Sequence, residues 1–471
     1  MRPGRAVALL VGLFCVSRLL YHTVSPGVGT VSLAPPLLRR MADAMAGRNF
    51  ETTTLERGMP LVDEGLLRND LARSLYYLHS QPPLFNLMVA GVLRSGADFA
   101  RTYQWLNWAM GLALYLLTFA LMRRLDLGPG AALLLCAAFL LNPNAMWMES
   151  AVYYGVVMAL LLTAAGYAFH RALTQGSRPW LAACCVLLGL LPLTRAYFSW
   201  PWCVLAVTSA VAAFHRVAPD VVRSRRAAVA AAALVPLLLV GGFQLKQWRL
   251  FHLASGSSWF GCNLTTMTAG MSGEKEEALR RGKVSALVKV YRNAAPEEYK
   301  PYVWVPHTGI PVLDQERKSG GEPNFHNLIY VPVGRIYLAD ALYVIVRSPH
   351  KYAFNVVNSV YIFSGYQIGM YWHEPSKFLG QWSAGDILAP FVGFPLIVIA
   401  VAHGLRRSWR AGRPEVERLT VGFLTGNFLY VALVACLFEK SEGPLYRYQA
   451  DAFLYTLLGL ACIEWRRRRA A

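Results

Sequence analysis

The chain has 471 residues, of which 55% are hydrophobic and only 15% are charged. Soluble domains usually carry about a quarter charged residues, so this composition excludes an ordinary soluble globular protein. The net charge of +19 would suit a nucleic-acid-binding protein, but the basic residues gather at the ends of apolar runs, as in the cytosolic loops of membrane proteins. The expected partner is therefore a lipid bilayer and not nucleic acid.

Ten apolar runs approach the length of about 20 residues that a bilayer span requires. They lie near residues 6–24, 103–121, 129–147, 151–169, 179–197, 199–214, 227–245, 386–404, 419–438 and 445–465. The run 84–95 is shorter, and we expect it to lie at the membrane interface. With both chain ends in the cytosol, all the basic clusters then face the cytosol, as the positive-inside rule requires.

Two large segments face away from the cytosol in this topology. We expect an N-terminal transmembrane module at residues 1–245, whose first external loop is 25–102. An external region follows at 246–385, within which the aromatic stretch 352–372 is apolar enough to enter the membrane. C-terminal transmembrane helices at 386–471 complete an all-α polytopic fold of about ten spans. The eight cysteines show no metal-type spacing, so neither a zinc site nor a disulfide framework is predicted from them.

Leucines in the first external loop recur at helical spacing. The pattern from Leu67 to Leu78 places apolar side chains on one face and charged side chains between them. This spacing predicts one amphipathic helix that lies on the membrane surface. The diproline at residues 82–83 ends the helix and turns the chain. Both ends of the helix would then hold polar residues at membrane level.

The polar residues at these ends form a motif. The acidic pair Asp63–Glu64 follows the first span, and a turn that begins at His79 leads into the diproline. This combination resembles the GT-C glycosyltransferase superfamily, nearest to its protein O-mannosyltransferase and aminoarabinose transferase branch. The resemblance implies a GT-C-like helical bundle, a polyprenyl-phosphate-linked sugar donor and an acidic base in the first external loop. His79 and Gln81 become candidate substrate-binding residues. Because Ser80 and Gln81 separate the histidine from the prolines, unlike the mannosyltransferase His-Pro-Pro pattern, the acceptor and the exact subfamily stay open.

The chemistry of such a transfer suits the acidic pair. A sugar on a phosphate carrier has a good leaving group, and a carboxylate can take the proton of an acceptor hydroxyl. Asp63 is the preferred base, Glu64 supports it, and a single displacement would invert the anomeric centre. The alternative is that both carboxylates cap the helix that follows, because carboxylates favour helix N-termini. The two roles can coexist.

A second polar segment connects two spans on the same side of the membrane. It contains Asn144, Glu149 and Tyr153. Glu149 matches the position where the superfamily often has a second acidic residue, so we expect it to support catalysis by orienting the acceptor. It could also help Asp63 to hold a divalent cation, which is the one cofactor that stays open. Asn144 and Tyr153 are candidate substrate-binding residues. The alternative is a solvated connecting turn.

Two arginines lie at the outer ends of apolar runs. Arg195 and Arg447 are candidates for binding the carrier phosphate, because a guanidinium makes bidentate contacts with phosphate. Tyr448 follows Arg447, and an Arg-Tyr pair at the last span also resembles the superfamily. The alternatives are that Arg195 reaches to the interface and that Arg447 pairs with Asp451 one helical turn later.

These features together predict a membrane glycosyltransferase. It would transfer a sugar from a polyprenyl-phosphate carrier to a hydroxyl of a protein, lipid or glycan. A bacterial inner membrane with a periplasmic active site is favoured over an endoplasmic-reticulum membrane. The alternatives are a flippase or transporter of the lipid-linked sugar and a non-catalytic scaffold. Transporters often show inverted repeats and polar groups at the bilayer midplane, and the sequence shows neither.

Overall fold

The computed structural model describes residues 1–24, 55, 58–365, 384–410, 412–440 and 442–470. Helices make up most of this part of the chain, and its only β pairing is one bridge between Arg317 and Pro323. The predicted all-α fold is therefore confirmed. Most of the expected first external loop up to residue 57 lies outside the described residues. The end of the stretch 352–372 also lies outside them.

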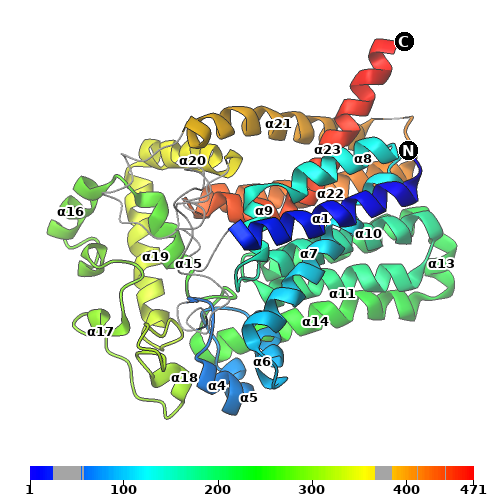
Figure 1. Cartoon of the computed structure of the whole chain (residues 1–471). Helices are drawn as coiled ribbons and strands as arrows, with labels where there is room; N and C mark the ends of the chain where they lie inside the picture. Colours follow the sequence, from blue (N-terminus) through cyan, green and yellow to red (C-terminus); the bar gives the residue numbers. More distant parts are fainter. Residues whose placement is uncertain (25–54, 56–57, 366–383, 411, 441, 471) are drawn as a thin grey trace.

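The helices form two groups, which Figure 1 shows in sequence colours. The bundle is made of α1 (Pro3–Val24), α7 (Phe99–Arg124), α8 (Pro129–Leu140), α10 (Gly155–Gln175), α11 (Arg178–Thr194), α12 (Trp200–Val217), α14 (Arg226–Phe251), α21 (Ala384–Trp409), α22 (Glu415–Phe438) and α23 (Gly443–Ala470). Its connections contain α4 (Glu64–Asn69), α5 (Leu71–Tyr76), α6 (Leu84–Arg94), α9 (Pro143–Glu149) and α13 (Pro219–Ser224). The region after α14 contains α15 (Phe260–Leu264), α16 (Ser272–Arg280), α17 (Pro296–Tyr299), α18 (Pro311–Asp314), α19 (Tyr330–Arg347) and α20 (Pro349–Ser364).

Six of these helices are long and apolar enough to cross a membrane. They are α1, α7, α10, α14, α21 and α22. A chain with several such helices is an integral, multi-pass membrane protein. The other expected spans fall on α8, α11, α12 and α23, so a total of ten spans stays a prediction. Helix α6 has 11 residues, about half of what a span requires.

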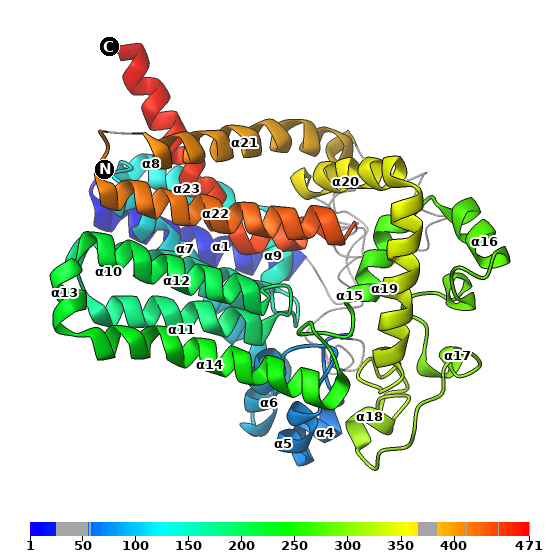
Figure 2. The ribbon, with the colours of Figure 1, turned by 180° about the vertical axis from the view of Figure 1, so that it is seen from behind.

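The bundle has two distinct ends in Figures 1 and 2. Both chain termini and α13 lie at one end, which we call the inner end. Helices α15 to α19 lie at the other, the outer end, where α19 runs across the direction of the bundle helices. Helix α20 turns back along the bundle and packs against α21, α22 and α23. Both termini therefore share one end, as the predicted topology requires.

The expected continuous span at residues 129–147 is wrong. Helix α8 ends at Leu140, and α9 begins at Pro143 after a break. The side chain of Asn142 accepts a hydrogen bond from the Asn144 amide at 2.9 Å and caps the new helix. The break has a physical cause: proline lacks an amide hydrogen, and the residue before a proline avoids helical geometry. This break directs Glu149 into the bundle.

The single amphipathic surface helix expected between Leu67 and Leu78 is also wrong. The segment forms two short helices, α4 and α5, which separate at Asp70. Leu67 and Leu78 are fully buried in the main hydrophobic core. The periodic leucines therefore dock the first loop onto the bundle and its helix α6, instead of facing lipid.

Two glycines allow the outer region to pack closely. The region after α14 has a separate hydrophobic core, rich in aromatic side chains, to which Trp259, Cys262 and Tyr330 belong. A Cβ atom at Gly261 would lie 1.9 Å from the carbonyl oxygen of Gly334, and one at Gly334 would lie 2.1 Å from that of Ser258. The backbones of α15 and α19 are therefore in direct contact where the two helices cross.

We predict that Gly261→Ala and Gly334→Ala each separate α15 from α19 and lower the melting temperature of the purified protein. The added methyl group meets backbone atoms, which cannot move aside as the end of a flexible side chain can. Gly273→Ala in α16 is the matched control, because its Cβ would have no neighbour within 4 Å. Equal melting temperatures for all three variants would contradict the close packing.

Candidate functional site at the outer end of the bundle

The two external regions are joined through the turn after α5. The ring of His79 is fully buried, with Nδ1 2.9 Å from the Ser258 hydroxyl and Nε2 2.9 Å from the His326 carbonyl oxygen. Because a carbonyl oxygen only accepts, Nε2 carries the hydrogen and Nδ1 accepts from Ser258. Burial lowers the pKa of His79 to about 4, so the ring is neutral. His79 thus holds the loops together, and Gln81, half-buried, follows it.

Asp63 lies where the second external region covers the first. Its side chain is 7% exposed. One carboxylate oxygen accepts hydrogen bonds from the amide and the hydroxyl of Ser319, both at 2.7 Å. The other oxygen accepts from the Leu66 amide at 3.3 Å and caps α4. The cap that the sequence offered as the alternative role is therefore present.

The hydrogen bonds of Asp63 decide its charge. Burial raises the pKa of this carboxyl group, but the bonds from Ser319 and from the amides of Leu66 and Gly65 outweigh burial and leave the pKa below its ordinary value. Asp63 is therefore ionised at neutral pH, as a general base must be. The backbone just before Asp63 is held by Asn86, whose side-chain oxygen accepts a hydrogen bond from the Val62 amide at 2.9 Å.

Glu64 has a different environment from its neighbour. Its carboxylate pairs with Arg68 at 2.7 Å, one turn later on α4, and both side chains are partly exposed. Pairs of this kind contribute little to stability, because water screens them. Glu64 therefore remains accessible beside Asp63.

Glu149 is fully buried and paired. Arg18 of α1 donates from Nε to one oxygen at 2.6 Å and from Nη2 to the other at 2.8 Å. The hydroxyl of Tyr115 donates to the same carboxylate at 2.5 Å. The expected alternative of a solvated turn is wrong, because the break before α9 brings Glu149 inward. Tyr448, also fully buried, lies beside this cluster.

Arg195, in the connection between α11 and α12, is the centre of another cluster, which is called the Arg195 cluster below. Its guanidinium lies 4.2 Å from the ring centre of Tyr154 and 5.9 Å from that of Tyr446. Glu442, which precedes α23, approaches it at 3.4 Å. The hydroxyl of Tyr153 contacts that of Tyr154. Arg195 is thus held by the rings of two tyrosines and a carboxylate, with Tyr153 beside one of those tyrosines, and is not simply directed to the interface.

Arg447 and Asn144 are both buried. Arg447 donates from Nη1 to the Phe363 carbonyl oxygen at 2.8 Å, and its Nε lies 3.2 Å from Asp451. The alternative assignment of Arg447, a pair with Asp451, is therefore present. Asn144 uses its amide in the cap of α9, and among the described residues its side-chain nitrogen has no hydrogen-bond partner.

The structure gathers the predicted residues into three groups. Asp63, Glu64, His79 and Gln81 lie in the joined loops, Tyr153 contacts Tyr154 of the Arg195 cluster, and Glu149 lies near Tyr448. Asn144 and Arg447 lie outside these three groups. No contact between Asp63 and Glu149 occurs among the described residues, which also contain no cluster of three or more His, Cys, Asp or Glu side chains fit for a metal ion. A divalent cation held jointly by Asp63 and Glu149 has no geometric support there.

Sequence reasoning did not assign several residues of the site. Arg18 interrupts an apolar run, and an arginine inside a span usually has a partner, so it carried a signal. Tyr115, Glu442 and Tyr446 carried none, because aromatic residues are common in spans and Glu442 lies in an ordinary connection. Ser319 lies in a polar stretch and is significant only through its contact with Asp63.

Two solved structures are similar to this chain. One is the crystal structure of ArnT from Cupriavidus metallidurans in the apo state, with 15% identity over 90% of this chain and 75% of that chain and a TM-score of 0.29. The other is the same protein bound to undecaprenyl phosphate, with 14% identity over 96% and 77% and a TM-score of 0.30. No protein-family model and no curated protein sequence matches the chain.

ArnT is an aminoarabinose transferase of the GT-C superfamily, the group that the motif at residues 63–83 resembles. The comparison thus returns a protein of the branch that the sequence motif resembles. At these TM-scores the likeness assigns neither a residue role nor a substrate to this chain.

We predict that Arg18 and Glu149 depend on each other for stability. Arg18→Met or Glu149→Leu alone should destabilise the protein by about 3–5 kcal/mol, because each leaves a buried charge without its partner. The double variant should lose much less than the sum of both, which a double-mutant cycle of unfolding in detergent measures.

The exposed Glu64–Arg68 pair gives the matched control for this cycle. Its coupling should stay below about 1 kcal/mol, because both side chains reach water. Additive losses at Arg18 and Glu149 would contradict the buried pair as a unit. A stable Glu149→Gln variant that has lost sugar transfer would instead assign Glu149 a direct catalytic role.

Proposed function

We propose that this protein is a membrane glycosyltransferase that moves a sugar from a polyprenyl-phosphate carrier to a hydroxyl acceptor at the outer end of its bundle. The observation that carries the proposal is the environment of Arg195. A guanidinium, two tyrosine rings and a carboxylate meet in one cluster at the outer end of a membrane bundle, and Tyr153 contacts one of those tyrosines. A phosphate head group can replace Glu442 as the anionic partner of Arg195, and tyrosine faces suit the apolar face of a sugar ring.

The proposed transfer is a single displacement. The acceptor oxygen attacks the anomeric carbon, and the bond from that carbon to the phosphate oxygen breaks with its electron pair on the phosphate. The acceptor proton passes to the carboxylate of Asp63. Arg195 stabilises the negative charge that develops on the leaving phosphate. One displacement inverts the configuration at the anomeric carbon.

The contacts of Asp63 suggest how this base becomes available. Hydrogen bonds from Ser319, Leu66 and Gly65 occupy its oxygens, and an ionised carboxylate has about four acceptor sites. An acceptor hydroxyl must therefore displace one donor. Ser319 is the donor that can leave, because it is exposed, whereas Leu66 belongs to a helix.

The other predicted residues have supporting roles in this proposal. Glu64 lies accessible beside the base. Glu149, held by Arg18, positions α9 and with it Asn144 and Tyr153. Arg447 and Tyr448 place the outer end of α23, which follows Glu442. A bacterial inner membrane with this end in the periplasm, and a protein, lipid or glycan acceptor, complete the proposal.

A flippase of the lipid-linked sugar is the second candidate. A flippase needs polar groups along the path that the head group takes across the bilayer. The Arg195 cluster and Asp63 lie instead toward one end of the bundle, which favours chemistry at a fixed membrane face. Proteoliposomes that hold a radiolabelled polyprenyl-phosphate sugar separate the two: a transferase releases the sugar from its carrier, and a flippase moves the intact lipid across.

We predict that Arg195→Gln weakens binding of undecaprenyl phosphate roughly ten- to a hundredfold, the effect of losing one charge-assisted contact. The lipid phosphate is a suitable probe because it is the leaving group whichever sugar is transferred. Arg280→Gln is the matched control, because Arg280 is an exposed arginine of the outer region that pairs with Glu277. Unchanged affinity in Arg195→Gln would remove Arg195 from the phosphate site.

We predict that Asp63→Asn keeps the fold and loses about 10²–10⁴ in the rate of sugar transfer. Asparagine caps a helix about as well as aspartate, but it cannot take a proton at neutral pH. Transfer and melting temperature are measured on the same preparation. A stable variant with full transfer would exclude Asp63 as the base and direct the search to Glu64.

We predict that Ser319→Ala moves the acidic limb of the transfer rate to higher pH. The wild-type rate should fall only as pH drops through the pKa of Asp63, which lies below the ordinary value for an aspartate. Loss of the Ser319 hydroxyl removes a hydrogen bond that favours the ionised form, so the pKa rises. The pH profile of transfer measures this shift, and an acidic limb that stays in place would contradict the role of Ser319.

A further inference from the structure

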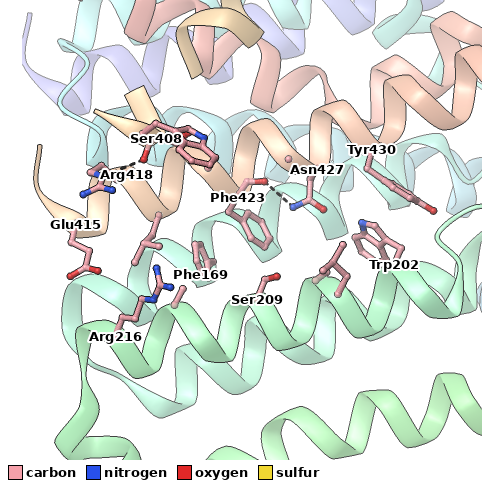
Figure 3. A pocket seen from close by; sticks show the side chains of 17 residues that line it. Phe169, Trp202, Ser209, Arg216, Ser408, Glu415, Arg418, Phe423, Asn427 and Tyr430 are labelled. Atoms are coloured by element: carbon pink, nitrogen blue, oxygen red, sulfur yellow. Dashed lines mark hydrogen bonds between the residues drawn. The ribbon is translucent and has the colours of Figure 1, made fainter. Parts of the chain in front are cut away.

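An open groove runs along the side of the bundle between α12 and α22, and its lining contains none of the predicted site residues. Its volume is about 510 Å³, and Figure 3 shows its lining side chains. Phe169 of α10 and Phe423 of α22 stack at a centroid distance of 4.6 Å in its wall. Leu205, which is 66% exposed, forms part of its rim. The middle of the groove is thus apolar and open to the surroundings of the bundle.

The two ends of the groove differ in chemistry. Arg216, Arg418 and Glu415 lie at the inner end, and Trp202 and Tyr430 lie at the other (Figure 3). Trp202 and Arg216 both belong to α12, so at a rise of 1.5 Å per residue they are separated by about 21 Å along the helix. This length covers most of the 18 residues of α12, so the groove follows the helix from its inner end nearly to its first turn.

The arginines at the inner end have unused donors. Arg216 is exposed and makes no hydrogen bond or ion pair with any described residue. Arg418 donates from Nε to the Ser408 carbonyl oxygen at 3.2 Å, which leaves its two terminal nitrogens for another acceptor. With Glu415 as the only acidic side chain in the lining, this end has a positive net charge. Two guanidinium groups of this kind suit a phosphate.

Each arginine also has an ordinary structural explanation. Arg216 lies in the last turn of α12, where a cation complements the helix dipole, and Arg418 links α22 to the end of α21. These roles explain the charges but not the apolar groove that begins beside them. Trp409, 82% exposed at the same end, adds an aromatic side chain of the type that lies at membrane interfaces.

We infer that this groove binds an anionic glycerophospholipid of the inner leaflet, with its phosphate on Arg216 and Arg418 and one acyl chain along Phe169 and Phe423 toward Trp202. The inference does not depend on the proposed transfer reaction. The positive charge of Arg216 and Arg418 at the inner end is complementary to a lipid phosphate. The apolar lining of the rest of the groove is complementary to an acyl chain. Gly422 and Gly426 leave room for that chain on α22.

The test uses phosphatidylglycerol added to the purified full-length protein, with bound lipid counted by native mass spectrometry. Wild type should retain phosphatidylglycerol, and Arg216→Gln with Arg418→Gln should weaken retention at least about tenfold. Arg223→Gln with Arg225→Gln is the matched control, because it removes two exposed charges from the same end of the bundle and should keep the lipid.

A second variant tests the apolar part of the groove. A Cβ at Gly426 would have no neighbour within 4 Å, so Gly426→Leu can direct its side chain into the groove and should also release phosphatidylglycerol. Phosphatidylcholine should bind the wild type more weakly. Retention by Gly426→Leu, equal loss in the Arg223 and Arg225 control, or equal binding of both lipids would each overturn the inference. None of these outcomes depends on sugar transfer.

Discussion

A guanidinium inside an apolar bundle needs a partner, and this requirement fixes where α1, α7 and α9 meet. Arg18 donates to both carboxylate oxygens of Glu149, and the Tyr115 hydroxyl donates a further hydrogen bond to the same carboxylate. Removing two charges from water costs several kcal/mol for each ion, and only good geometry repays that cost. The pair therefore tolerates little movement of α9 relative to α1. The outer end of the bundle, and the site on it, depends on that fixed position.

The sequence predicted what depends on local pattern and missed what depends on distant contacts. Apolar runs located the helices because a span needs a continuous apolar length, and the acidic pair marked the N-cap that Asp63 forms. The pattern of leucines from Leu67 to Leu78 could not distinguish a face toward lipid from a face toward protein, because both are apolar. The position of Arg18 in an apolar run indicates that it has a partner, but its pairing with Glu149, like that of Ser319 with Asp63, is set by the folded chain.

Asp63 shows how one set of contacts can serve both structure and chemistry. The hydrogen bonds that lower its pKa also cap α4 and join the first loop to the second region. A carboxylate held this way is ionised over the whole neutral range, yet its acceptor sites are occupied. A base of this kind works only if its weakest-held donor gives way to the substrate. The exposed Ser319 hydroxyl satisfies that condition, whereas the amide of Leu66, inside a helix, does not.

Tyr197 connects the Arg195 cluster to the groove between α12 and α22. Its hydroxyl donates to Gln449 of α23, and its ring lies 4.8 Å from that of Tyr446. Its carbonyl oxygen accepts from Tyr430, which lines the aromatic end of the groove. Tyr197 thus contacts both Tyr446 of the Arg195 cluster and Tyr430 at the aromatic end of the groove. Because packed aromatic side chains have little free volume, a change in the position of Tyr430 must be accommodated at Tyr197, next to the cluster that holds Arg195.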